Sequence, residues 1–225
     1  MMAPVRIAVL GGTGHEGAGI ACRAARAGHQ VWIGSRDPGR AQARAQELNE
    51  LAGCTRIAGA GLEEAARAAD IVVLAVPYAA QAATARQVRS ALQGKILIDV
   101  TVPLKPPRVS TVQLPPEDSC VCALQALLGP EVRVASAFQN VSAHALMDLA
   151  APVDCDVLVC ADDPDVRAAC VDLIAGMGLT AIDAGPLANS VVAEALTSVL
   201  IHLNRTYKAR ASGIRITGLP ARRGG

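Results

Sequence analysis

The amino-acid sequence predicts an α/β protein with a doubly wound, mostly parallel sheet and a small C-terminal helical segment. Short aliphatic runs alternate with longer helical patterns along almost the whole chain, as expected for parallel strands that are buried on both faces. Hydrophobic residues make up 52% of the 225 residues and aromatic residues only 2%, so the core must be aliphatic. A glycine-rich segment, residues 11–17 (GGTGHEG), directly follows the first aliphatic run.

The glycine-rich segment has the spacing Gly12-x-Gly14-x-x-Gly17 between a predicted strand, residues 5–10, and a predicted helix. In this setting the spacing is the fingerprint of a Rossmann-type dinucleotide-binding turn. Gly12 permits the tight turn, Gly14 lets a pyrophosphate approach the backbone, and Gly17 lets the helix pack closely on the strand. The phosphates would lie at the positive end of the helix dipole. A glycine-rich turn without a ligand is the alternative, but the flanking strand and helix favour dinucleotide binding.

The second strand, expected at residues 30–34, ends where NAD-binding domains carry an acid for the ribose 2′-hydroxyl. This chain has Ser35 and Arg36 there, with Arg40 one helical turn further on. Hydroxyl and guanidinium groups would hold a 2′-phosphate through charge-assisted hydrogen bonds. Asp37 is the nearest acid, and we interpret it as the N-cap of the next helix rather than as a ribose ligand. The segment therefore predicts NADP(H) rather than NAD(H).

After a possible short strand at residues 56–58, a clear buried strand is expected at residues 70–76. Ligands of open α/β sheets bind outside the carboxyl ends of the strands. Val76, Pro77 and Tyr78 lie at that end, so we expect them beside the nicotinamide half of the cofactor. For Tyr78, an exposed position at a helix start is an equal alternative.

Two more strands are expected at residues 95–100 and 132–138, separated by a proline-rich segment, residues 101–107, and a helix. The proline-rich segment suits neither a helix nor a central strand, and we expect a stiff rim. Gln139 and Asn140 follow the second of these strands at its carboxyl end, which makes them candidates for the site. Residues that only form a turn would give the same pattern.

The last third of the chain continues the alternation, with strands expected at residues 156–160 and 179–183 and a helix at 164–177 between them. A long helix, residues 191–207, is expected to pack deeply through a nearly continuous apolar face: Val192, Ala195, Leu196, Val199, Leu200 and Leu203. A terminal strand is expected at residues 213–218. We divide the chain into an NADP-binding Rossmann domain, residues 1–140, and a smaller C-terminal α/β part, residues 141–225, that completes the substrate pocket.

Composition and charge argue against several other classes of protein. The formal net charge is +1 with dispersed basic residues, which is not the footprint of a nucleic-acid-binding protein. The sequence has neither a charged leader followed by an apolar run nor about 18 uninterrupted apolar residues. We therefore expect a cytoplasmic protein that does not span a membrane. The seven cysteines and four histidines lack zinc spacing and suit reduced thiols, so no metal site is predicted.

Nearly the whole chain, from Val5 to about Gly218, resembles the family of NADPH-dependent reductases of coenzyme F420. The resemblance rests on short segments: residues 11–14 (GGTG), 34–36 (GSR), 76–77 (VP), 183–189 (DAGPLAN), 194–197 (EALT), 203–208 (LNRTYK) and 213–216 (GIRI). It implies a direct hydride transfer between the nicotinamide C4 of NADP(H) and C5 of the deazaflavin ring. Such a transfer needs no metal and no covalent nucleophile, which agrees with the lack of a catalytic dyad or triad in the sequence.

The resemblance also implies roles for individual residues. It assigns the adenine nucleotide and the phosphates to Thr13, Gly14, His15, Glu16, Ser35, Arg36 and Arg40. It places Tyr78, Val102 and Ala143 along the cofactor. It places Gln139, Thr197, Ser212 and Gly213 at the deazaflavin site.

The chain departs from the family pattern at three positions of the deazaflavin site. Gln139 stands where the family carries a histidine, and Val191 and Ala195 stand where it carries an arginine and a serine. Gln139 can still donate and accept hydrogen bonds, whereas Val191 cannot bind an anion.

Two other functions fit the same sequence pattern. One is an NADPH-dependent reductase of another acceptor, such as a flavin, a metal chelate or an imine. The other is a non-catalytic NADP(H)-binding sensor, which would bind NADPH without oxidising it. We also expect a homodimer, because the apolar helix near the C-terminus is followed by only a small segment.

Overall fold

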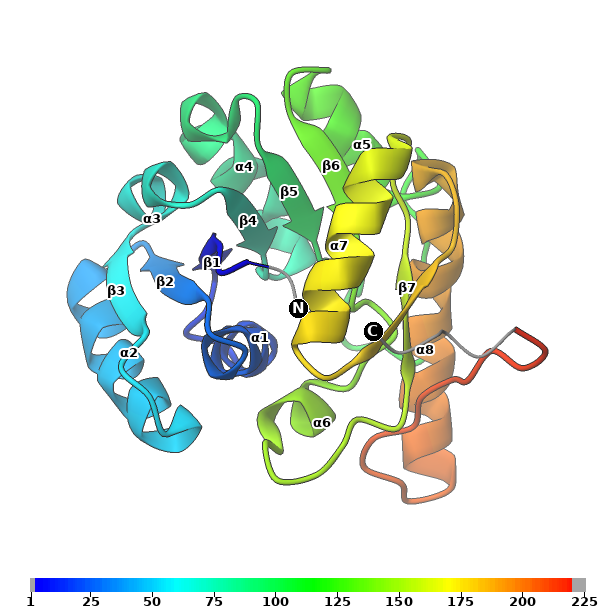
Figure 1. Ribbon diagram of the computed structural model, residues 1–225. Coiled ribbons are helices and arrows are strands. Elements are labelled where there is room, and N and C mark those ends of the chain that lie inside the picture. Colours follow the sequence, from blue (N-terminus) through cyan, green and yellow to red (C-terminus); the bar gives the residue numbers. More distant parts are fainter. Residues whose placement is uncertain (1–2, 220–225) are drawn as a thin grey trace.

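The computed structural model, which describes residues 3–219, contains a six-stranded parallel sheet with the strand order β3-β2-β1-β4-β5-β6 (Figure 1). The strands are β1 (Arg6–Leu10), β2 (Gln30–Ser35), β3 (Ile57–Gly61), β4 (Ile71–Leu74), β5 (Ile96–Asp99) and β6 (Arg133–Ser136). β1 pairs in parallel with both β2 and β4, so the strand order reverses there and opens a crevice at the carboxyl ends. The predicted Rossmann-type fold is confirmed.

Helices cover both faces of this sheet, and the alternation of side chains along β1 separates the two layers. The helices are α1 (His15–Arg26), α2 (Pro38–Ala52), α3 (Leu62–Ala68), α4 (Tyr78–Leu92) and α5 (Cys120–Leu128). Ile7 and Val9 belong to the hydrophobic cluster that contains α1 and α2, whereas Ala8 and Leu10 belong to the cluster that contains α3, α4 and α5. Both faces of the sheet are therefore buried, as the aliphatic runs predict.

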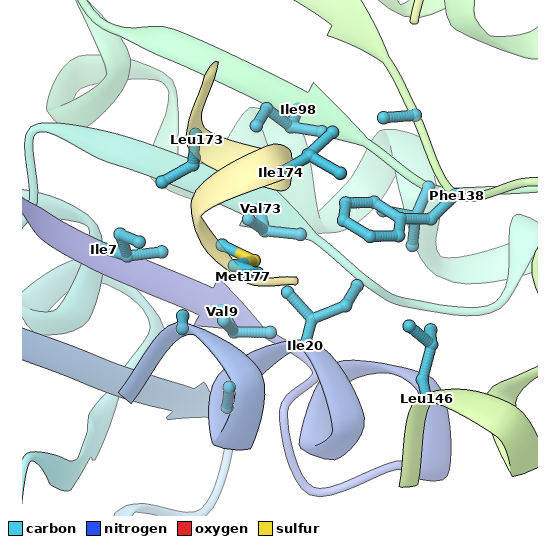
Figure 2. Close-up of a cluster of buried hydrophobic side chains, with 14 of the residues drawn as sticks. Ile7, Val9, Ile20, Val73, Ile98, Phe138, Leu146, Leu173, Ile174 and Met177 are labelled. Carbon is cyan, nitrogen blue, oxygen red and sulfur yellow. The ribbon is translucent and has the colours of Figure 1, made fainter. Parts of the chain in front are cut away.

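A second, two-stranded parallel sheet lies beside the first. This part contains α6 (Ala143–Met147), β7 (Asp156–Val159), α7 (Pro164–Gly176), β8 (Thr180–Asp183), a 3₁₀ turn (Leu187–Asn189) and α8 (Ser190–Thr206). Figure 2 shows Leu173, Ile174 and Met177, in and just after α7, packed with Val73 and Ile98 of the large sheet. One hydrophobic cluster thus contains residues of both sheets.

Aspartate side chains cap the N-termini of α2 and α7. Asp37 Oδ1 accepts a hydrogen bond from the backbone N–H of Arg40 at 3.0 Å, and Asp163 Oδ1 accepts one from Asp165 at 2.8 Å. The interpretation of Asp37 as an N-cap is therefore confirmed. The short helix α6 was not predicted, because five residues are too few to show a helical period.

The prediction for the buried face of α8 is wrong for Val192 and Val199, whereas Leu200 is buried as predicted. Val192 and Val199 are 59% and 45% exposed, whereas the buried face includes Ser190, Glu194 and Ser198. Ser190 and Glu194 are buried with hydrogen-bond partners on other elements; Ser190 Oγ, for example, donates to Ser136 Oγ at 2.7 Å. Hydrophobicity alone therefore selects the wrong face of this helix.

The terminal strand predicted at residues 213–218 is also absent. The backbone N–H of Asp156 donates to the carbonyl oxygen of Ile214 at 2.8 Å, but the N–H of Ile216 donates to the carboxylate of Asp156 at 2.6 Å. The carboxylate of Asp156 thus takes the place of the next backbone acceptor, and the backbone pairing of a strand ends there.

By length and composition alone, Leu187–Thr206 is the one helical stretch among residues 3–219 that is apolar enough to cross a membrane. A third of its most apolar window (33%) is buried inside the protein, and its buried polar groups bond to neighbouring elements.

Candidate functional site

The three glycines of the fingerprint have different structural roles. A Cβ at Gly12 would lie 2.5 Å from Ile33 Cγ2, and one at Gly17 would lie 2.9 Å from Gly11 O and from Gly12 Cα. Both glycines are therefore required by the packing of the turn. A Cβ at Gly14 would meet only Gly11 O, at an ordinary 3.4 Å. Nothing in the protein explains the missing side chain at Gly14, whereas the approach of a ligand would.

The turn delivers the N-terminus of α1 to the carboxyl edge of the sheet. Gly14 is the N-cap and supplies no side-chain acceptor for the N–H groups of the first turn. An anion at this position would satisfy those groups and interact favourably with the helix dipole. The local geometry fits the pyrophosphate of a dinucleotide.

The predicted residues for a 2′-phosphate are brought together. Ser35, Arg36 and Arg40 line one cavity of about 460 Å³, which also contains Thr13 and Gly14. Ser35 Oγ accepts a hydrogen bond from the N–H of Asp37 at 3.2 Å, which leaves its own proton to donate to a ligand. Within residues 3–219, no carboxylate lines this cavity.

A larger cavity of about 730 Å³ adjoins the first, and both are lined by Gly14, Ala75, Val76, Pro77 and Ala79. The predicted residues that line the larger cavity are Gly14, His15, Glu16, Gly17, Val76, Pro77, Tyr78, Val102, Gln139, Asn140, Ala143, Thr197 and Ser212. Tyr78 is the half-buried first residue of α4. The two cavities thus form one groove across the carboxyl edge of the sheet.

Two predicted residues do not line either cavity. Gly12 is buried within the turn, consistent with a purely structural role. Gly213 lies against Cys155, where an added Cβ would be 2.7 Å from the cysteine Cβ. Close packing explains this glycine, whereas its neighbour Ser212 does line the larger cavity.

Part of the cavity wall was missed by the sequence prediction. Leu200, Ile201 and Asn204 line the larger cavity together with Thr197. Their spacing from Thr197 is i+3, i+4 and i+7, which places them on one face of α8. Once Thr197 is assigned to the site, helical periodicity could have found the other three residues.

Gln139 is nearly completely buried (2% exposed) and contributes an unpaired acceptor to the site. Its Nε2 donates to the carbonyl oxygen of Asp99 at 2.8 Å, and its own carbonyl oxygen accepts from Thr197 Oγ1 at 2.6 Å. Its Oε1 has no hydrogen-bond partner among the described residues. A buried acceptor beside a cavity needs a donor, and the N–H groups of a ligand ring would supply one.

Asn140 behaves differently from its neighbour. Its Nδ2 donates to the carbonyl oxygen of Asp156 at 2.7 Å, and its Oδ1 accepts from the N–H of Leu158 at 3.4 Å. The amide of Asn140 therefore anchors β7, and the residue contributes contact surface to the cavity.

Two carboxyl groups, that of the half-buried Glu16 and that of the fully buried Asp99, shape the electrostatics of the cavity. Burial, aided by the charge of Asp99, raises the pKa of Glu16 to about 8. Burial also raises the pKa of Asp99 to about 6, against hydrogen bonds from Thr101 and Gln81 that lower it. Glu16 is therefore mainly protonated at neutral pH and does not repel an anion at the glycine turn. Within residues 3–219, no three His, Cys, Asp or Glu side chains form a group that could hold a metal.

The strand order, the glycine turn at the crevice and the groove above it define a dinucleotide-binding protein of the Rossmann class. The fold is similar to that of a hypothetical protein from Sinorhizobium meliloti, with a TM-score of 0.65 and 23% identity, over 84% of this chain and 88% of that one. A family model described as NADP oxidoreductase coenzyme F420-dependent matches residues 6–103.

Two curated relatives are similar to almost the whole chain. The F420-dependent NADP reductase of Methanothermobacter marburgensis is 43% identical over 223 residues, which are 96% of this chain and 100% of that protein. The F420-dependent NADP reductase of Methanocaldococcus jannaschii is 40% identical over 226 residues, covering 96% and 99%. The chain belongs to the family of F420-dependent NADP reductases.

Proposed function

We propose that this protein is an oxidoreductase that transfers a hydride between NADP(H) and the deazaflavin coenzyme F420. The observation that carries the proposal is the single groove with two chemically different halves that meet at Val76 and Pro77. One half has cations for a phosphate, and the other has apolar walls suited to a flat ring system. Family membership supports this pair of substrates.

The NADP(H) half of the proposal rests on the turn and on the end of β2. Gly14 leaves room for the pyrophosphate at the N-terminus of α1, with Thr13, His15 and Glu16 beside it. Arg36 and Arg40 would bind the 2′-phosphate, together with the hydroxyl of Ser35, through charge-assisted hydrogen bonds. Val76, Pro77, Tyr78, Val102 and Ala143 would hold the nicotinamide end.

The deazaflavin half rests on the wall formed by β6, the loop after β5 and α8. The nicotinamide C4 supplies or accepts the hydride, and the protein contributes binding, orientation and the exclusion of water. Gln139 Oε1 would accept a hydrogen bond from the ring, and Thr197 holds the backbone of Gln139 in place. Asn140 and Ser212 would contribute contact surface at the same site.

The finer features of the proposal are a cytoplasmic location, a homodimer and a division into two parts, residues 1–140 and 141–225. All seven cysteines are free and most are buried, which suits a reducing compartment. Val192 and Val199 expose apolar surface on α8, which supports a partner of the same chain. The two sheets, one formed before residue 140 and the other after it, support the division.

The decisive experiment mixes the protein with NADPH and oxidised F420 and follows the absorbance of both. We expect NADPH and oxidised F420 to be consumed in equal molar amounts. A Gly14→Val variant should remain folded but inactive, because its side chain blocks the pyrophosphate. Binding of NADPH without oxidation by F420, flavins or imines would indicate a sensor instead. Oxidation with another acceptor but not with F420 would indicate a different reductase.

A further inference from the structure

Among residues 3–219, no lysine or arginine lines the larger cavity, and Glu16 supplies the one carboxyl side chain that does. Coenzyme F420 carries a phosphate and glutamate tail in addition to its ring, so charges that bind this tail must lie outside the cavity.

Exposed cations flank the wall of the larger cavity on two chain segments. Lys105 and Arg108 are adjacent in sequence to the lining residues Leu104 and Val109. Arg205 directly follows the lining residue Asn204 at the end of α8, and Lys208 and Arg210 precede the lining residue Ser212. We call Lys105, Arg108, Arg205, Lys208 and Arg210 the basic rim.

The two segments of the basic rim meet in space. Arg205 Nη1 donates to Ser110 Oγ at 3.1 Å, which joins the end of α8 to the loop after β5. The N–H of Ser212 donates to Asn204 Oδ1 at 2.9 Å, which folds the following segment back onto α8. Gln113 Nε2 donates to the carbonyl oxygen of Arg108 at 3.0 Å and braces the loop. Figure 1 shows α8 beside β7, on the side of the molecule away from α2.

The charge of the basic rim is not balanced by nearby carboxylates in the sequence. Residues 100–116 and 195–225 contain no aspartate or glutamate. Among residues 3–219, none of the five rim side chains forms an ion pair, whereas Arg6, Arg44, Arg67, Arg167 and Arg215 each do. Arg205 also suits the negative end of the α8 dipole, but this effect does not account for Lys105 and Arg108 on the loop.

We propose that the basic rim binds the phosphate and carboxylate groups of the F420 tail while the ring occupies the larger cavity. This inference rests on the proposed function. It assigns the two clusters of cations to different substrates: Arg36 and Arg40 to NADP(H), and the basic rim to the second substrate. Tail recognition here takes place at an exposed surface.

The test compares F420 with a 5-deazaflavin riboside that has the same ring but no phosphate or glutamate. Dissociation constants of both are measured by fluorescence titration, and steady-state constants with NADPH are measured in parallel. In an Arg108→Gln/Arg205→Gln variant we expect the dissociation constant and KM for F420 to rise about 3- to 30-fold, as for two exposed ionic contacts. The constants for the riboside and for NADPH should change less than about twofold by the same reasoning.

Two control variants separate charge from structure. Ser110→Ala removes the contact to Arg205 but keeps every rim charge, and it should leave F420 binding unchanged. Arg56→Gln/Arg86→Gln removes the same net charge from exposed positions that do not line the groove, and it should also have no effect. Added salt should weaken F420 binding in the wild type much more than in the rim variant, because exposed contacts are screened.

Equal affinity for F420 and the riboside, or an equal loss for both in the rim variant, would overturn the tail-binding inference. If F420 binds through the rim but is not reduced by NADPH, the inference stands and the proposed function fails. If both acceptors are reduced with the same salt response, the proposed function stands and the tail-binding inference fails.

Discussion

At the scale of single residues, the end of β2 determines which nicotinamide cofactor the groove accepts. Arg36 and Arg40 line the smaller cavity beside Ser35, and no carboxylate lines that cavity within the described chain. A charge-assisted hydrogen bond contributes about 1.5–3 kcal/mol. We therefore expect Arg36→Ala to weaken NADPH binding about 10- to 100-fold, measured by titration, and to leave NADH binding nearly unchanged. Equal losses for both cofactors would show that Arg36 does not bind the 2′-phosphate.

A second prediction at this scale concerns Glu16 and the dependence of stability on pH. Burial raises its pKa from the ordinary value to about 8, so the folded state holds a proton that the unfolded state releases above about pH 4.5. The folded protein therefore loses stability as the pH rises from about 4.5 to 8. One pKa unit corresponds to about 1.4 kcal/mol, and because the side chain is partly exposed we expect at most about 2 kcal/mol in total.

Glu16→Gln should remove this loss, because its amide does not ionise. The measurement is urea unfolding of the cofactor-free protein between pH 5 and pH 9, at intervals of about one unit. Glu50→Gln, at an exposed position on α2, is the matched control and should keep the wild-type pH dependence. If the free energy of unfolding has the same pH dependence in the wild type and in Glu16→Gln, the raised pKa of Glu16 is contradicted.

The site residues that could be predicted from sequence are those adjacent to a strand end or within the glycine spacing. Ser35, Val76 and Gln139 follow aliphatic runs directly, so their position at the carboxyl edge follows from the parallel sheet. Leu104 lies on the loop after β5, and only the tertiary fold brings this loop to α8 and to the cavity. Sequence spacing carries no information about such distant pairs.

At the scale of elements, a single carboxylate joins α8 to α5. Glu194 is buried and accepts hydrogen bonds from Ser119 Oγ at 2.6 Å, from the N–H of Cys120 at 2.9 Å and from that of Val121 at 3.3 Å. It thus caps the N-terminus of α5 from another element. Thr197 lies three residues later on α8, and its Oγ1 donates to the carbonyl oxygen of Gln139 at 2.6 Å. The cap of α5 and the wall of the cavity are therefore coupled through one helix.

Glu194→Ala should leave these donors without partners and destabilise the protein by about 1–3 kcal/mol, as measured by urea unfolding. Glu194→Gln retains one acceptor oxygen and should cost less. Because α8 bears the deazaflavin wall, we expect the glutamine variant to raise KM for F420 more than KM for NADPH. Equal changes in both constants would mean that Glu194 stabilises the fold without positioning the site.

At the scale of the whole molecule, the alternating pattern of the chain predicts the sheet but not the orientation of the last helix. The face of α8 that contains Val192 and Val199 is apolar in sequence and exposed in the structure. The opposite face is buried because Ser190 and Glu194 find hydrogen-bond partners on β6 and α5. Hydrophobic periodicity locates the helix, whereas the buried face is selected by pairings between residues far apart in the sequence.

The exposed face of α8 leads to the prediction for the assembly. Val192 and Val199 are seven residues apart and therefore lie on the same side of the helix. An exposed apolar helix face of this kind is typical of an interface between subunits, so we expect a homodimer by light scattering. A Val192→Asp/Val199→Asp variant should be monomeric, because each carboxylate would have to be buried without a partner.

Leu51→Asp, at another exposed apolar position on α2, should remain dimeric. The monomeric variant should still bind NADPH, because Val192 and Val199 line neither cavity. A monomeric wild-type protein would refute the dimer, and loss of NADPH binding on dissociation would show that the groove requires the second subunit.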